Sequence, residues 1–553
     1  MKLRALLAIL LVAVALVSLS CQKKRQASGA ATFSFINRGD IITLDLNQMS
    51  YLQDFRVIYA LREGLFTYDA SNNFSPVPAL ATSWSQSDDK RVWTFRLRTD
   101  AKWSNGDPVV AGDFVFSWRN LLESPGEYTY LLYYIRNAKA YEDAYREQTG
   151  MSFAEVGVAA PDDHTLVVTL NDPVPFLPDL LAFPPFYPRH ARSMEKFKQT
   201  DSKGRVSYSA EYTRPGNVVT NGPFVLTRWE PGRTLVMERS ETYWNKSAIR
   251  LERIEMVVIN DPQSAFVQYD QGRVDWLADV SAEIASQLKE QNRPDLRIGD
   301  AFGTAFLTVN CAESVAELGD KKNPLSDVRV RQALSMSIDR DYIVKSITRM
   351  GERPANSYVP PGFFDGWTST PAPMLNLASA KKLLADAGYP NGQGMPTISI
   401  AYNSENPTRK ELAEYMAFEW KQKLGVPCEL RPLELKTYRN YITTKQYTLG
   451  LAAWYGDYMD PSTFTDKYLS TSLNNDSNWG PAAYDDLLLQ ASKEPDEKLR
   501  LKLLMQAEAM INTELPVIPL YHYVNVTLHR DNVKGVLTNP RNLIVWKDIF
   551  VER

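Results

Sequence analysis

Hydrophobic and polar residues alternate along short segments in the first 300 residues. In the segment 92–98, Trp93, Phe95 and Leu97 occupy every second position, and polar side chains stand between them. This period of two predicts a strand with one buried face. Similar reasoning predicts strands at 166–170, 224–229 and 234–238 and a helix at 114–122.

Helical spacing becomes more frequent after residue 327. Val330, Leu334 and Ile338 share one helical face, and Asp327 is placed to cap the start of that helix. Further helices are expected at 378–387, 409–424 and 499–511, and strands at 397–402 and 517–528. A strand, a helix and a second strand in succession suggest a βαβ unit, so the pattern favours an α/β fold.

Composition and charge exclude several classes of protein. The 553 residues contain 44% hydrophobic and 23% charged residues, which is typical of a soluble globular protein of several domains. Lys and Arg number 62 against 65 Asp and Glu, for a net charge of -3. Nothing in this balance would neutralise a phosphate backbone, so nucleic acid is not an expected partner.

The N-terminus has the pattern of an export signal. Lys2 and Arg4 precede the apolar run 5–17, which is too short to span a bilayer. Small residues follow, and Cys21 comes next, an arrangement that resembles a bacterial lipoprotein signal even though Ser18 replaces the usual Leu. We therefore expect residues 1–20 to be a lipoprotein signal peptide and Cys21 to be lipidated; a plain secretory signal is the alternative.

Residues 21–31 are polar and basic, and we expect them to form a flexible tether to the membrane. Cys311 and Cys428 remain in the body, too few and too far apart for a zinc site, and whether they form a disulfide is left open. The four histidines show no ligand spacing, so we expect no bound metal.

Motifs of catalysis are missing from the sequence. There is no Gly-rich phosphate loop, no G-x-S-x-G and no H-E-x-x-H. We therefore expect a protein that is not an enzyme and that uses no cofactor.

A series of short signatures runs in a fixed order from about residue 40 to the C-terminus. They are YALREGL at 59–65, WTF at 93–95, KWSNG at 102–106, NGPF at 221–224, YW at 243–244, GRVD at 272–275, DVRVRQAL at 327–334 and AKKLLADAGY at 380–389. In order and spacing they resemble the dipeptide- and oligopeptide-binding family of solute-binding proteins of ABC importers. The oligopeptide-binding lipoproteins are the most similar members.

The resemblance implies an α/β fold of two hinged lobes, like that of periplasmic binding proteins, with an extra domain on the first lobe. Lobe I would comprise residues 32–62, 190–302 and 524–553, the extra domain residues 63–189, and lobe II residues 303–523. Ligand would be enclosed between the lobes as they close.

The segment 454–461, WYGDYMDP, resembles the part of the family that contacts the peptide. The resemblance implies that Asp457 meets the ligand's α-ammonium, that Trp454 lines a side-chain pocket, and that Tyr455 lies beside them. A buried ammonium needs an opposite charge, and a carboxylate supplies one through charge-assisted hydrogen bonds. Asp457 also fits a turn carboxylate, and Trp454 also fits a core position.

Other tyrosines are candidates for the same site by resemblance. Tyr128 or Tyr130 would approach the ammonium end, and Tyr523 would border the cleft. The family's Arg three positions before the Trp is replaced by Leu451, and its Trp at the start of the upstream helix is replaced by Leu435. The residues that would meet the ammonium of the peptide thus match the family, whereas those that would meet its carboxylate differ. Either Arg409 or Lys410 is a candidate to replace the missing Arg.

The sequence therefore predicts a monomeric, lipid-anchored extracytoplasmic protein that binds oligopeptides and delivers them to a membrane-embedded ABC permease. A same-family binder of another solute, such as a murein peptide, a metal chelate or a sugar, is the first alternative. A surface adhesin is the second alternative, and a peptidase is the third.

Overall fold

The computed structural model describes residues 31–37 and 39–552. The expected signal peptide, Cys21 and the tether up to residue 30 lie outside the described residues. Within them, no helix is both long enough and apolar enough to cross a bilayer. Cys311 and Cys428 are both free thiols.

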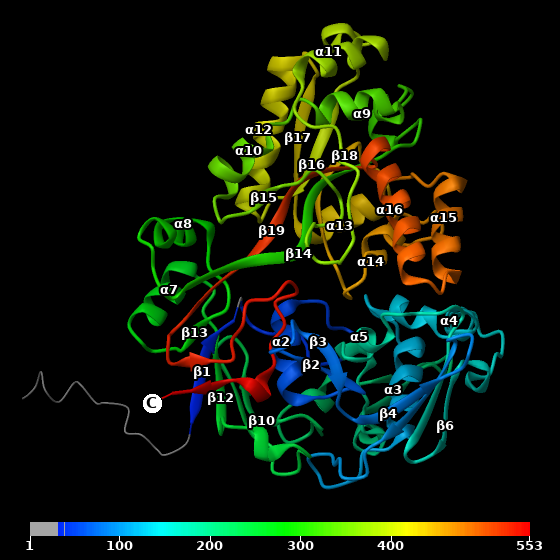
Figure 1. The fold of residues 1–553 in the computed structure, drawn as a ribbon, viewed down its shortest axis with the longest axis vertical. Helices are drawn as coiled ribbons and strands as arrows, with labels where there is room; N and C mark the ends of the chain where they lie inside the picture. The colour runs from blue at the N-terminus through cyan, green and yellow to red at the C-terminus, as the bar shows by residue number, and fades with distance from the viewer. Residues whose placement is uncertain (1–30, 38, 553) are drawn as a thin grey trace, which may run out of the picture.

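One large mixed sheet runs through the whole molecule (Figure 1). Its strands, in spatial order, are β10 (Phe224–Glu230), β11 (Thr234–Arg239), β12 (Arg253–Val257), β1 (Thr32–Ile36), β13 (Trp276–Leu277), β19 (Val517–His529), β14 (Leu296–Val309), β18 (Leu449–Tyr455), β16 (Ile398–Asn403) and β17 (Cys428–Leu433). The short strand β15 (Arg353–Pro354) pairs with β19 off this path. We call the part built on β1 and β10–β13 the first lobe, and the part built on β16–β18 the second lobe.

The two lobes are joined by β14 and β19, which pass between them side by side (Figure 1). These antiparallel strands pair from Leu296 opposite Leu528 to Thr308 opposite Val517, with the register interrupted between Asp300 and Thr304. The lobe boundaries expected at 302/303 and 523/524 fall inside these two strands. A paired two-strand connection resists shear but bends at an irregularity, which suits a hinge.

A second sheet of four strands lies beside the first lobe, with helices packed on it (Figure 1). In spatial order its strands are β4 (Ala81–Gln86), β5 (Val92–Leu97), β7 (Thr165–Thr169) and β6 (Val158–Asp162), and the helices are α3 (Ala111–Glu123) and α4 (Ala138–Glu147). Its apolar face joins the first-lobe core, where Phe33, Phe35, Trp93 and Trp546 belong to one buried cluster. The first lobe and this smaller sheet are therefore one hydrophobic unit.

The remaining elements are short pairs of strands and covering helices. The pairs are β2 (Phe66–Asp69) with β3 (Ser75–Pro78), β8 (Lys198–Thr200) with β9 (Val206–Tyr208), and β20 (Val533–Lys534) with β21 (Phe550–Val551). The first lobe has α2 (Leu52–Leu61), α5 (Leu177–Leu181), α6 (Ala191–Met194), α7 (Pro262–Asp270) and α8 (Ala282–Glu290), and the second has α9 (Val328–Ser335), α10 (Arg340–Tyr342), α11 (Leu377–Asp386), α12 (Pro407–Leu424), α13 (Leu435–Thr443), α14 (Ser462–Thr465), α15 (Ala482–Lys493) and α16 (Glu497–Glu514).

The predicted βαβ unit is present in the second lobe. Parallel strands β16 and β17 are connected through α12, and the other predicted elements lie within a few residues of their expected bounds. Asp327 caps α9 by accepting a hydrogen bond from the backbone N–H of Arg329. Ile338 was expected on this helix but lies beyond its end at Ser335, because the apolar spacing continues into the buried turn that follows.

Two aromatic residues on α12 give a matched test of the second-lobe core. Trp420 is fully buried and donates a hydrogen bond to the carbonyl of Leu334, whereas Phe418 is 61% exposed. We expect Trp420→Ala to lower the free energy of unfolding by about 3–5 kcal/mol, because it leaves a cavity. Phe418→Ala is expected to change it by less than about 0.5 kcal/mol. Denaturant unfolding followed by circular dichroism measures both, and equal effects would contradict this account of the core.

Candidate functional site

Strand β18 presents an unpaired backbone edge between the lobes. Among the described residues, β14 pairs with all of Leu449–Tyr455, but β16 pairs with β18 only at Leu449 and Gly450. The carbonyl of Leu451 accepts two side-chain hydrogen bonds from outside the sheet, so it points away from β14. Backbone groups alternate in direction along a strand, so those of Ala453 point the same way. An extended chain can add to such an edge.

Asp457 follows the end of this edge. Its Oδ2 accepts a hydrogen bond from the hydroxyl of Tyr130, and its backbone N–H donates to Thr463 Oγ1 at 3.1 Å. In the described chain, no side chain donates a hydrogen bond to its second carboxylate oxygen, Oδ1. A cationic group that enters here would find an oxygen able to accept its hydrogen bonds.

The surroundings of Asp457 oppose its ionisation. Burial raises the pKa of this carboxyl to about 6, and the nearby Glu127 carboxylate acts in the same direction. The Tyr130 hydroxyl and the Arg541 guanidinium lower the pKa but do not offset burial. A positively charged ligand would supply the missing compensation, because an adjacent cation favours the carboxylate form.

A buried ion pair from the first lobe holds the backbone around Asp457. Arg541 and Asp179 pair at 2.6 Å, with side chains 7% and 5% exposed. Asp179 Oδ2 also accepts a hydrogen bond from the backbone N–H of Met459 at 2.9 Å, and Arg541 Nη1 donates to the carbonyl of Asp457 at 3.2 Å. The lobes cannot separate without breaking these two backbone contacts, so the structure is a closed form.

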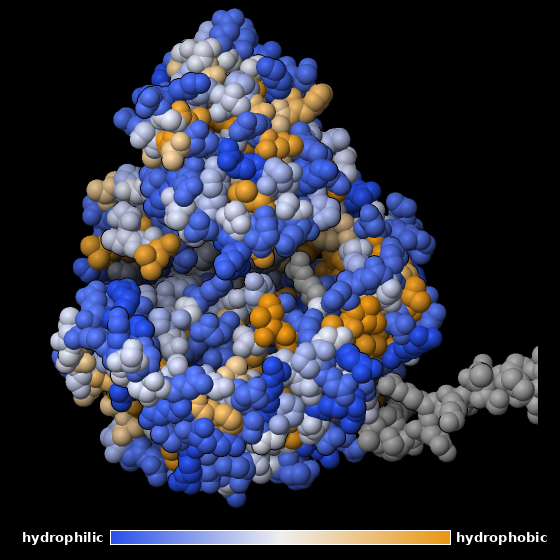
Figure 2. All heavy atoms as spheres, turned by 180° about the vertical axis from the view of Figure 1, so that it is seen from behind, coloured by the Kyte–Doolittle hydropathy of each residue, from blue (hydrophilic) through white to orange (hydrophobic). Residues whose placement is uncertain are grey.

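Aromatic residues extend the same interface. The rings of Phe176 and Tyr458 stack with centroids 4.2 Å apart and planes 7° from parallel. The Tyr134 hydroxyl lies 2.9 Å from that of Tyr458 and donates to Asp466 Oδ2 at 3.2 Å. Seen from behind, the surface is hollowed along the boundary between the two halves (Figure 2).

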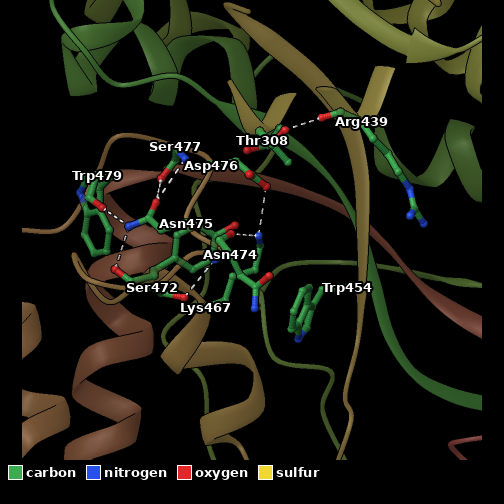
Figure 3. A network of polar contacts seen from close by, with 12 residues as sticks. Thr308, Arg439, Trp454, Lys467, Ser472, Asn474, Asn475, Asp476, Ser477 and Trp479 are labelled. Carbon is green, nitrogen blue, oxygen red and sulfur yellow. Dashed lines mark hydrogen bonds and ion pairs between the residues drawn. The ribbon is translucent and has the colours of Figure 1, made fainter. Parts of the chain in front are cut away.

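Trp454 is half-buried and fixed from two sides. Its Nε1 donates to the carbonyl of Thr463 at 2.8 Å, and Lys467 Nζ lies 5.0 Å from its ring centroid. Lys467 in turn donates to the carbonyl of Asn474 and pairs with Asp476 at 3.3 Å (Figure 3). The indole is therefore a rigid wall, with an ammonium behind it that already has an anionic partner.

Tyr455 at the end of β18 and Tyr523 on β19 form an aromatic surface. Tyr455 is 50% exposed and stacks on Tyr523 at 4.9 Å, and Tyr521 meets Tyr523 edge-on at 5.0 Å. A Cβ atom at Gly303 would lie 2.5 Å from the Tyr455 ring, so only glycine leaves room for this stack.

The structure separates the two tyrosines that the sequence left as alternatives. Tyr130 reaches Asp457, whereas Tyr128 packs edge-on against Phe55 at 5.6 Å and Phe183 at 5.1 Å. Tyr128 is thus partly buried against the first-lobe core and supports the loop that carries Tyr130.

Sequence reasoning did not find Asp179, Arg541 or Tyr134. Each lies far along the chain from Asp457, in a segment with no motif that marks it, and only the packing of the lobes brings it there. Asp460 lies two positions before α14, which begins at Ser462. It accepts a hydrogen bond from the backbone N–H of Ser462, and its other partner is Arg500.

Three comparisons place this geometry among known proteins. Residues 75–476 match the model of the bacterial extracellular solute-binding proteins, family 5. The chain is 32% identical to the periplasmic oligopeptide-binding protein OppA of Escherichia coli K12, over 92% of each chain. It is 31% identical to the dipeptide-binding protein DppE of Bacillus subtilis 168, over 86% of this chain and 84% of that one. The structure of the Escherichia coli murein tripeptide-binding protein MppA superposes with a TM-score of 0.80 at 30% identity, covering 95% of this chain and 99% of that one.

The Asp460–Arg500 pair anchors the loop that carries Asp457. Two hydrogen bonds of 2.7 and 2.8 Å join the side chains, which are 11% and 8% exposed. We expect Asp460→Ala to lower the free energy of unfolding by about 3–5 kcal/mol, because Arg500 is left as an uncompensated buried charge. The control is Asp341→Ala, which removes a 67%-exposed partner of Lys345 and should cost less than about 1 kcal/mol. A small effect of Asp460→Ala in urea unfolding would disprove the anchoring role.

Proposed function

Because the chain belongs to the bacterial extracellular solute-binding proteins of family 5, we propose that it captures short peptides outside the cytoplasm and delivers them to an ABC importer. Relatives named for binding oligopeptides, dipeptides and a murein tripeptide support a peptide as the ligand. The mechanism is reversible binding with lobe closure and involves no covalent chemistry.

One observation carries this proposal: the edge of β18 that β16 leaves unpaired ends beside the partly buried carboxyl group of Asp457. The backbone groups of Ala453 would pair with the main chain of an extended peptide, whatever its side chains. Asp457 would accept hydrogen bonds from the peptide's α-ammonium and so set its register. Trp454, Tyr455 and Tyr523 would line the spaces for side chains, and Tyr130 would hold the carboxylate in place.

We propose the lobe boundaries that the resemblance implied: lobe I at 32–62, 190–302 and 524–553, the extra domain at 63–189, and lobe II at 303–523. The hinge would then be the interrupted pairing of β14 and β19. Closure would bring Asp179 and Arg541 onto the backbone of Asp457 and Met459, which couples occupation of the site to the shape offered to the permease.

The same proposal places a lipid on Cys21 and the folded body at a membrane surface as a monomer. Metabolic labelling with a palmitate analogue tests for the lipid, and a Cys21→Ser variant shows whether Cys21 is the residue that carries it. Label on the wild type and none on the variant is expected.

Native mass spectrometry of the protein lacking residues 1–31 tests the ligand class. We expect a set of added masses that match mixed short peptides, because closed lobes retain ligand during purification. A single non-peptide mass would replace the substrate and keep the fold. Protein that stays empty when mixed with a peptide library would contradict peptide capture.

The pKa of Asp457 predicts how binding depends on pH. In the closed form without ligand, its pKa of about 6 lies above the ordinary value of 3.8, and a bound ammonium would lower it. Affinity should therefore be constant above about pH 7 and fall by up to about tenfold per unit below pH 6, as protons compete for the carboxylate. Isothermal titration calorimetry between pH 4.5 and 8 measures this.

Asp457→Asn is the matched control for that titration. It should bind free peptides about 10- to 100-fold more weakly at pH 7.5, because a charge-assisted hydrogen bond is lost, and show no such pH dependence. An N-acetylated peptide should bind both proteins with similar affinity. Wild-type affinity for free peptides in Asp457→Asn would rule out the assignment of the ammonium.

A further inference from the structure

A loop near the C-terminus connects the first lobe to the hinge and to the segment that carries Asp457. We call residues 535–546 the strap; it follows β20, which pairs with β21, and it is the red loop that rises toward β14 in Figure 1. Its last residues, 543–546, are buried in the first-lobe core, and Trp546 Nε1 donates to the carbonyl of Arg56 at 2.7 Å. Both ends of the strap are therefore fixed to the first lobe.

Two asparagine side chains hold the tip of the strap, residues 540–542. Asn539 is 5% exposed; its Oδ1 accepts a hydrogen bond from the backbone N–H of Leu543 at 2.8 Å, and its Nδ2 donates to the carbonyl of Leu543 at 2.8 Å. Asn525 on β19 donates to the carbonyl of Asn539 at 2.8 Å. An amide side chain both donates and accepts, so Asn539 closes the tip from both sides.

The tip is bonded to the hinge through Pro540. The carbonyl of Pro540 accepts a hydrogen bond from the backbone N–H of Phe302 at 2.7 Å. Phe302 lies where the pairing of β14 with β19 is interrupted, and its own carbonyl accepts from the N–H of Gly456 at 2.8 Å. A Cβ atom at Gly456 would lie 2.0 Å from the Phe302 ring, so a larger residue would displace it. The strap thus reaches the residue before Asp457 through the hinge.

Arg541, the next residue of the tip, reaches Asp457 directly. Its Nη1 donates to the carbonyl of Asp457 at 3.2 Å while the guanidinium pairs with Asp179. Burial raises the pKa of the Asp457 carboxyl, and the Tyr130 hydroxyl and the Arg541 guanidinium lower it. The position of Arg541 therefore affects the charge of the group that would receive the ammonium of a peptide.

The other charged and titratable groups that face Asp457 come from both lobes. They are the hydroxyls of Tyr128 and Tyr130, the Glu127 carboxylate with its partner Arg439, and Asp179 with its partner Arg541. Glu127 and Arg439 are about half exposed, so solvent screens their charges. Arg541 is buried, and its charge acts on Asp457 through a medium that screens it less.

We propose that Asn539, assisted by Asn525, is a positioning residue for peptide binding: it holds the tip of the strap so that Arg541 stays beside Asp457. This inference rests on the proposed function and deepens it. The side-chain hydrogen bonds of both asparagines go to the strap itself, not to β18 or to Asp457, so each acts through Arg541.

The test measures the affinity for tri-alanine near pH 5.5 and near pH 8.5, by isothermal titration calorimetry on the full chain in detergent. In Asn539→Ala the tip is released and Arg541 moves away, so the carboxyl group of Asp457 takes up a proton about one pH unit higher. The loss of affinity relative to the wild type should then be about fivefold greater at the lower pH than at the higher pH. Circular dichroism of each variant checks that the fold is intact.

Three further variants separate positioning from a loss of stability. Asn525→Ala removes the other support of the tip and should change the pH dependence in the same direction; it decides the question if Asn539→Ala is unfolded. Asn532→Ala removes a 3.2 Å hydrogen bond to the carbonyl of Glu552 at the base of the strap and should retain the wild-type pH dependence. When Asn539→Ala is added to Asp457→Asn, it should introduce no pH dependence, because no carboxyl group is left to protonate.

Two results would overturn the positioning role and leave peptide binding intact. An equal loss of affinity at both pH values would mean that Asn539 only stabilises the fold. Unchanged affinity at both pH values would mean that the strap does not determine where Arg541 lies. Failure of the wild type to bind any peptide would overturn both proposals.

Discussion

The buried pair of Asp179 and Arg541 is the interaction on which the site depends. These side chains come from segments more than 350 positions apart, Asp179 from α5 and Arg541 from the C-terminal segment. Each side chain also bonds the backbone of the second lobe: Asp179 accepts from the N–H of Met459, and Arg541 donates to the carbonyl of Asp457. Burying an ion pair has a large desolvation cost, which such additional hydrogen bonds offset. Opening the lobes would expose this pair and deprive it of two partners, so closure is favoured by the pair itself.

The same arrangement explains why Asp457 is poised for a cation. Burial raises the pKa of its carboxyl, and the hydroxyl of Tyr130 from across the lobe boundary donates to it. The carboxylate is therefore incompletely satisfied in the closed form, which is the condition under which an incoming ammonium gains most. In the proposed mechanism, an ammonium would complete the contacts of Asp457 in the closed form, so ligand binding and lobe closure would favour each other.

Tolerance of sequence follows from the way an edge strand recognises its partner. In the proposed function, main-chain groups on β18 would pair with the peptide backbone, which is identical in every peptide, and the aromatic rings of Trp454 and Tyr455 would contact its side chains. Asp457 would then set the register of the peptide through its ammonium.

The linear pattern of the chain determined much of this protein. Hydrophobic residues alternate with polar ones in 92–98 and recur at helical spacing in 409–424, because each pattern reflects which side of the element is buried. The strands, the helices and the βαβ unit could therefore be predicted from the sequence. The ordered signatures gave the family, and WYGDYMDP located Asp457 and Trp454. Three-dimensional packing decided the rest. It puts the Tyr130 hydroxyl on Asp457 and packs Tyr128 against Phe55 and Phe183, because residues close in sequence point to different sides of a turn. It also assembled Asp179, Arg541 and Tyr134 around Asp457, contacts that exist only because β14 and β19 let two lobes fold onto each other.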